Sequence, residues 1–184
     1  MAATRIEITS TIEDARARIR KKQIEGMGFS GKINKVALAE VYTLDAMLEN
    51  NDLGKVAQMP ADPITQHAAV DIPQAPETFT WAVEIGYHPG VTDNVAATAG
   101  ENIEDLLKKK LQEGEGVYTS EVMFLSGDLS RDDAQKIAEG LANPLIQRTH
   151  IKSFDAFKRE KGMGVVVPKV RLEGRPHVDL VALL

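Results

Sequence analysis

The side chains that most often perform chemistry are scattered in this sequence. Cysteine is absent, which excludes disulfides, thiolate metal sites and cysteine nucleophiles. No serine lies in a G-x-S-x-G elbow, and neither G-x-G-x-x-G nor G-x-x-x-x-G-K-[ST] occurs. The histidines have no helical i, i+4 spacing and no acidic cluster beside them: His67, His88, His150 and His177. The sequence therefore predicts no catalytic residue, no cofactor-binding residue and no metal ligand.

Residues 86–94 differ from the rest, because they combine a rigid Pro-Gly turn with the expected start of a helix. The backbone N–H groups of a helix start can bind an anion, and a rigid loop can dock a partner. The alternative is a plain strand-to-helix turn in which Asp93 itself occupies the positive helix end. The residues of this turn that we expect to contact a partner are Tyr87, His88, Gly90, Thr92, Asp93 and Asn94.

A second expected contact lies where a later strand begins, at Asn143, Gln147 and Arg148. Asn143-Pro144 would end the preceding helix, because the residue before a proline disfavours the helical conformation. Exposed polar residues at such a rigid position are suited to docking. Both segments are hypotheses about partner contacts.

Composition narrows the classes of function. The 184 residues include 27 acidic and 22 basic side chains, for a net charge of −5, so a nucleic-acid partner is not expected. No run of about 18 apolar residues occurs, and the N-terminus lacks the pattern of a secretory signal. The sequence therefore predicts a cytoplasmic protein without a membrane partner.

An internal repeat gives the organisation of the chain. Ile6-Glu7-Ile8 returns as Val83-Glu84-Ile85, and Val41-Tyr42-Thr43 returns unchanged at 117–119 with nearly the same separation in sequence. A third match joins 61–66 to 142–147, with a slightly larger separation. Three matches in the same order indicate two copies of one unit.

The periodicities predict a β-α-β-(β)-α-β unit twice. The second copy shows a strand at 79–87, a helix from a cap at 92 or 93, a strand at 117–125, a helix after the capping box Ser130–Asp133, and a strand at 145–152. The first copy is weaker: strands at 5–9 and 33–45 and after Pro63, with helices at 12–27 and 53–58. A hairpin at Ala39-Glu40 inside the long strand is left open. The expected apolar stripes are Ala15, Ile19 and Met27 in the first helix, and Val95, Ala99, Ile103, Leu106, Leu107 and Leu111 in the 92-onward helix.

The expected fold class is therefore α+β, with two tandem units whose sheets are mainly antiparallel and whose helices lie on one face. We expect the first unit at 1–70, a proline-containing linker at 71–78, the second unit at 79–160 and an extended C-terminal linker or tail at 161–184. Each unit is small for an independent core, so pairing of the two units, face to face or edge to edge, would form a dimer-like pair within one chain.

Several of these residues resemble a known family. The segments 89–94, 117–119, 127–131 and 141–147 together look like the PurS-like N-terminal region of phosphoribosylformylglycinamidine synthase. The closing run Ala142-Asn143-Pro144-Leu145-Ile146 is similar to the end of the small PurS subunit. The first copy resembles that subunit more loosely, so the resemblance covers roughly residues 4 to 157.

The resemblance implies a function in purine biosynthesis. The family's enzyme uses ATP and glutamine to convert formylglycinamide ribonucleotide to the amidine. A synthetase part holds ATP and magnesium, a glutaminase part holds the cysteine nucleophile, and the PurS-like part bridges them. By this resemblance the chain is a non-catalytic assembly module that binds no cofactor itself. Its expected partners are the synthetase and glutaminase parts, and homo-oligomerisation is left open.

Two rival hypotheses use similar units. A tandem regulatory module of the ACT type would bind a small metabolite between paired copies and needs a glycine-rich first loop in each. Only the second copy has one, at Pro89-Gly90, whereas the first has 11–14 instead. An acylphosphatase-like hydrolase needs an Arg in the phosphate-binding loop, and neither first turn supplies it.

Overall fold

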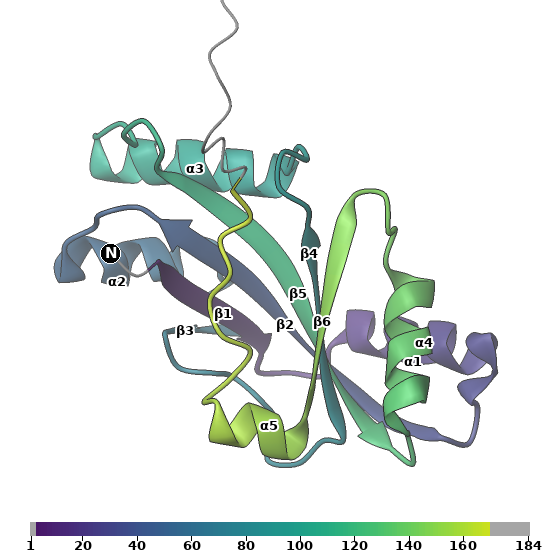
Figure 1. The fold of residues 1–184 in the computed structure, drawn as a ribbon. Helices are drawn as coiled ribbons and strands as arrows, with labels where there is room; N and C mark the ends of the chain where they lie inside the picture. Colours follow the sequence, from purple (N-terminus) through teal and green to yellow (C-terminus); the bar gives the residue numbers. More distant parts are fainter. Residues whose placement is uncertain (1–2, 170–184) are drawn as a thin grey trace, which may run out of the picture.

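The computed structural model describes residues 3–169. These residues form one six-stranded antiparallel sheet and five α-helices, so the fold is mixed α+β as predicted (Figure 1). The strand order is β3-β1-β2-β5-β4-β6. The strands are β1 (Thr4–Ser10), β2 (Ile33–Asp45), β3 (Gln66–Val70), β4 (Trp81–Tyr87), β5 (Gly116–Gly127) and β6 (Gln147–Ser153). The helices are α1 (Ala15–Ile24), continued by a π-helical turn η1 (Glu25–Phe29), α2 (Asn50–Gln58), α3 (Asn94–Leu107), α4 (Arg131–Leu141) and α5 (Phe154–Arg159).

The long strand β2 has the predicted bounds and is unbroken, so the hairpin at Ala39-Glu40 is wrong. β2 pairs with β1 on one side and with β5 on the other, and Ala39 lies opposite both Thr9 and Val122. Backbone hydrogen bonds to β1 and β5 keep this part of β2 in the extended strand conformation. A turn there would break both ladders and leave buried backbone groups without partners.

The expected apolar stripe of α1 is wrong. Ala17 and Ile24 face the sheet, whereas Ile19 is 56% exposed and Met27 36% exposed. The helix begins three residues later than expected, because Asp14 caps it by accepting a hydrogen bond from the Arg16 backbone N–H at 2.8 Å. This start directs the Ala17–Ile24 face, two turns long, at the sheet.

The stripe of α3 is correct only in part. Ala99 and Ile103 are buried, but Ala96 replaces Val95 in the core, and Val95 is 56% exposed. The helix start is fixed by Asp93, which accepts from the Ala96 backbone N–H and from Thr119 on β5. This double attachment sets the rotation of the helix about its axis. The capping box of α4, between Ser130 and Asp133, is confirmed.

Four helices cover one face of the sheet in two pairs. One core cluster joins α1 and α4 over β2, β4 and β5, with Ile24, Leu38, Met123 and Ile137 among its buried members. A second cluster joins α2 and α3 over β1, β2 and β3, around Ile6 and Leu44. Each cluster therefore takes one helix from the first half of the chain and one from the second, so neither half buries its apolar face alone.

The opposite face is covered by the chain that follows β6, and the fifth helix there was not expected. Phe157 of α5 packs edge-on against Phe79 and Phe124, with ring centroids 5.3 and 5.7 Å away. A turn at residues 160–163 follows α5, and residues 164–169 then run across the sheet without regular secondary structure (Figure 1). Met163 of this segment is 2% exposed. Of the expected C-terminal linker or tail, 161–184, residues 170–184 lie outside the described residues.

A buried ionic cluster lies under this segment. The guanidinium of Arg5 on β1 donates to both carboxylate oxygens of Glu84 on β4, at 3.0 and 3.3 Å, and to Glu7 at 2.7 Å. It also donates to the Gly164 carbonyl at 3.1 Å, and Ser120 donates to Glu84 at 2.6 Å. Burial alone would lower the pKa of Arg5, but the two carboxylates raise it above its ordinary value. The cluster thus joins strands from both halves and the covering segment.

One of the three sequence matches does not join equivalent positions. Val41 packs on the face that α5 covers, whereas Val117 packs on the opposite face, under α3. Because side chains alternate along a strand, aligning these two residues exchanges the two faces of the sheet. The interpretation of the Val-Tyr-Thr match as equivalent residues is therefore wrong.

Replacing Glu84 by alanine will destabilise the protein strongly. The change leaves the buried Arg5 charge without its bidentate partner, and we expect a loss of about 3–5 kcal/mol in the free energy of unfolding. Glu139→Ala, an exposed change on α4, is the control and will shift stability by less than about 0.5 kcal/mol. Urea denaturation followed by circular dichroism measures both, and equal midpoints for the two variants would contradict this role of Glu84.

Candidate docking edge

The two segments expected to contact partners meet at one edge of the sheet. β4 pairs with the edge strand β6, and Tyr87 lies opposite Gln147. Beyond the strand end, the His88 backbone N–H donates to the Ile146 carbonyl at 2.9 Å. The Arg148 side chain donates through Nε to the Tyr87 carbonyl at 3.2 Å. Strand pairing therefore places the end of one segment against the start of the other.

The entry to β6 is a rigid turn that presents a leucine. Asn143 Oδ1 accepts from the Leu145 backbone N–H at 3.1 Å, and Gln147 Oε1 accepts from the Asn143 backbone N–H at 2.8 Å. His88 Nε2 lies 3.2 Å from the Pro144 carbonyl oxygen. These contacts hold the backbone while the Leu145 side chain stays 85% exposed. Asn143 and Gln147 thus act on the turn itself, and Leu145 is its exposed apolar tip.

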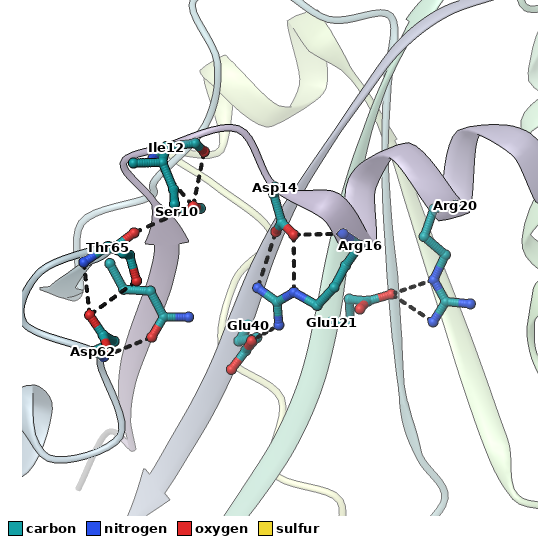
Figure 2. A network of polar contacts seen from close by, with 10 residues as sticks. Ser10, Ile12, Asp14, Arg16, Arg20, Glu40, Asp62, Thr65 and Glu121 are labelled. Carbon is teal, nitrogen blue, oxygen red and sulfur yellow. Dashed lines mark hydrogen bonds and ion pairs between the residues drawn. The ribbon is translucent and has the colours of Figure 1, made fainter.

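The entry to β3 has the same construction. Asp62 Oδ1 accepts from the Thr65 backbone N–H at 2.8 Å (Figure 2). It also accepts from the Ile64 backbone N–H at 2.9 Å, and Gln66 Oε1 accepts from the Asp62 backbone N–H at 2.8 Å. Ile64, the counterpart of Leu145, is 84% exposed. The sequence reasoning missed both aliphatic residues, although the match of 61–66 with 142–147 already aligned them.

β3 and β6 are the two outer strands of the sheet, so the two turns lie at its opposite edges. We call Ile64 and Leu145 with their turns, 62–66 and 143–147, the edge knobs. Each turn fixes the backbone while one large aliphatic side chain stays exposed, so docking that covers this side chain would remove apolar surface from water.

In the turn before α3, some of the expected contact residues are exposed, whereas Asp93 is hydrogen-bonded within the protein. Gly90 has φ of +82°, which favours glycine, and Gly90, Thr92 and Asn94 are exposed. Asp93 points inward: Oδ1 accepts from Ala96 at 2.9 Å, while Oδ2 accepts from the Thr119 backbone and hydroxyl at 2.9 and 2.7 Å. Burial, and secondarily the Asp93 charge, raises the pKa of Tyr42 nearby. Asp93 is therefore engaged within the protein, in agreement with the plain helix-cap alternative.

The charged side chains behind this edge come from β6. Arg148, His150 and Lys152 alternate along the face that α5 covers. Burial and the Lys152 charge lower the pKa of His150. Lys152 is itself fixed, because Nζ donates to the Gly162 carbonyl at 2.9 Å and pairs with Glu160 at 2.8 Å. Of these three residues, Arg148 is the one that contacts the 86–94 segment, through the Tyr87 carbonyl.

Within residues 3–169, no group of three or more His, Asp or Glu side chains lies close enough to hold a metal ion. No helix in this part of the chain is long and apolar enough to cross a membrane. Comparison with protein-family models and with curated proteins finds no match for the chain.

Replacing Asp93 by alanine will lower stability, because it removes the helix cap and both bonds to Thr119. The expected loss is about 1–2 kcal/mol in the free energy of unfolding. The neighbouring change Asn94→Ala is the control and will have an effect below about 0.5 kcal/mol. Thermal unfolding measures both. An Asp93→Ala variant as stable as the parent protein would show that the cap contributes nothing.

Proposed function

We propose that this chain is a non-catalytic assembly module of the PurS-like type, which joins the glutaminase and synthetase parts of phosphoribosylformylglycinamidine synthase. The observation that carries this proposal is the pair of edge knobs, Ile64 and Leu145, on the two outer strands of one continuous sheet. A bridge needs two docking surfaces that face different partners, and opposite sheet edges supply them.

The strand register supports the tandem arrangement within this proposal. Thr4 lies opposite Leu44 in the first half, and Trp81 lies opposite Leu125 in the second. On the outer strands, Ser10 opposite Gln66 corresponds to Tyr87 opposite Gln147. Adding one constant to the residue numbers of β1 gives the corresponding residues of β4. Adding a second, slightly larger constant converts β2 to β5 and β3 to β6. This second constant makes Glu40 and Glu121, which lie opposite each other, equivalent.

The two halves then pair through equivalent strands, β2 and β5, as two subunits would across a two-fold axis. This relation supports the description of the chain as a dimer-like pair of units. It also places the two knobs at equivalent positions, because the constant that converts β3 to β6 also converts 62–66 to 143–147. One partner surface could not reach both edges without wrapping the sheet, so the arrangement suits two partners.

In this function the chain supplies surfaces and no chemical step. By the family resemblance, ATP, magnesium and the cysteine nucleophile belong to the partner parts. The chain's own polar groups maintain its shape: every buried side-chain nitrogen and oxygen in the described residues has a hydrogen-bond partner. A rigid, internally satisfied scaffold is what a bridging part requires.

The test is to mix the chain with separately expressed synthetase and glutaminase parts. Chromatography with light scattering follows complex size, and turnover is assayed with glutamine and with ammonia. We expect a complex of all three, and a rise in the glutamine-dependent rate alone. If nothing associates and a small metabolite raises the melting temperature of the chain, the tandem ACT-like module is the better description.

The knobs give this test its structural specificity. Leu145→Asp and Ile64→Asp place a charge at a surface that must be desolvated on docking, so each will weaken association at least tenfold, or about 1.4 kcal/mol. Ile19→Asp, at an aliphatic residue that is also exposed, is the matched control and will leave association unchanged. If both knob variants associate like the control, the knobs are not the docking residues.

A further inference from the structure

A groove on the first half of the chain has no assigned role. It is a cavity of about 690 Å³ beside the start of α1 and the start of β2. Ala17, Val36 and Leu38 form its apolar wall on the helix-covered side, and Phe124 and Pro76 line it from the other face of the sheet. The groove is therefore lined from both faces of the sheet, at the edge formed by the start of β2.

That edge exists because β1 is shorter than β2. The last residue pair between them is Thr9 with Ala39, so among the described residues β2 has a strand neighbour only on its β5 side from Ile33 to Leu38. The backbone groups of these residues that face the groove are available to an added extended segment. Apolar side chains on both sides of the edge offer contacts to alternate residues of such a segment.

The second half contains the same groove in a filled form. It lies between α3 and the start of β5, with Ala96 and Val117 in the positions of Ala17 and Val36, and its volume is smaller, about 380 Å³. The chain itself fills it: Leu111, from the segment after α3, packs on that core, and its backbone N–H donates to Glu104 at 2.9 Å.

Leu111 and Val117 lie close to the helix backbone at Gly100. A methyl group on Gly100 would lie 3.8 Å from Leu111 Cδ1 and 3.8 Å from Val117 Cγ2. The first half has only residues 30–32 between η1 and β2, where the second has 108–115 between α3 and β5. The short connection leaves no residue in the position of Leu111, and the first groove stays open.

Charge distinguishes the two grooves. In the filled groove the helix contributes Glu104, and the filling segment contributes Lys110, which pairs with it. In the open groove the walls carry Arg18 and Lys21 from α1 and Lys35 from β2. Of the two acidic side chains there, Asp14 is paired with Arg16, and Glu13 lies 3.7 Å from Arg18. Lys21 lies 3.5 Å from Glu25 of η1, whereas Lys35 makes no ion pair within residues 3–169.

We propose that the open groove binds an extended, acidic peptide segment of another protein, anchored by an aliphatic side chain in the position that Leu111 occupies in the second half. The anchor packs on Ala17, Val36 and Leu38, and the acidic residues of the segment pair with Arg18, Lys21 and Lys35. This surface is separate from the edge knobs, and the proposal does not depend on which enzyme the chain serves.

The test uses a blocked synthetic peptide, EEVTLTVEE, titrated into the full chain labelled with ¹⁵N. We expect chemical-shift changes confined to the segments that line the groove, which are 9–21, 34–38 and 74–76, and to Phe124. Replacing the central leucine of the peptide by alanine removes the anchor and will weaken binding about tenfold. The peptide KKVTLTVKK will bind more weakly than EEVTLTVEE, and added salt will reduce the difference.

A matched pair of protein variants completes the test. Arg18→Glu with Lys21→Glu reverses two charges of the groove and will weaken binding of the acidic peptide about tenfold. Lys22→Glu with Lys136→Glu makes the same change in net charge outside the groove and will have little effect. Absence of binding at about 1 mM peptide, shifts elsewhere on the surface, or equal affinity of both variants would each overturn the proposal.

Discussion

The pairing of β2 with β5 holds the sheet together, because within the described residues it is the only strand pairing between the half-sheet β3-β1-β2 and the half-sheet β5-β4-β6. The register sets Glu40 directly opposite Glu121, and like charges in that relation are destabilising. Two arginines of α1 offset the repulsion. Arg16 pairs with Glu40, and Arg20 pairs with Glu121 at 3.1 Å (Figure 2). The helix is thereby attached to both halves at the point where they join.

Two further devices strengthen the same junction. On the helix-covered face, each core cluster combines a helix of the first half with one of the second, so separating the halves would expose both cores. On the other face, Arg5 reaches across β2 and β5 to Glu84, and the Gly164 carbonyl closes the cluster from above. Because a buried charge pair is costly to break, the cluster resists displacement of either half and of the covering segment. The edge knobs are thus held in a fixed relation to each other.

The elements with strong alternation or strong caps could be predicted from the sequence. β2 and the capping box at Ser130–Asp133 are examples, since their signals depend only on neighbouring residues. The rotation of α1 and α3 could not be predicted, because tertiary contacts decide which side chains turn inward. Arg16 and Arg20 of α1 pair with Glu40 and Glu121, and the α3 cap Asp93 accepts from Thr119. The helix α5 was missed because its burial depends on Phe79 and Phe124, which are distant in the sequence.

The sequence indicates the two candidate segments separately, but not that they lie together. Their proximity depends on the pairing of β4 with β6, which alternation within each strand does not predict. Which side chains are exposed depends on the folded surface. The sequence therefore does not indicate Leu145 and Ile64 as contact residues, and it does not show that Asp93 faces inward. The third sequence match joins 61–66 to 142–147. The same separation in sequence, applied to the long strands, aligns Glu40 with Glu121, whereas the Val-Tyr-Thr match aligns residues on opposite faces of the sheet.

The central claim is that the two edge knobs contact two different partners. It is tested most directly by placing a photo-crosslinking amino acid at position 64 or at position 145 and irradiating a mixture with the synthetase and glutaminase parts. The account predicts that one position captures the synthetase part and the other the glutaminase part. Capture of the same part from both positions, of a second copy of this chain, or of neither part would contradict it.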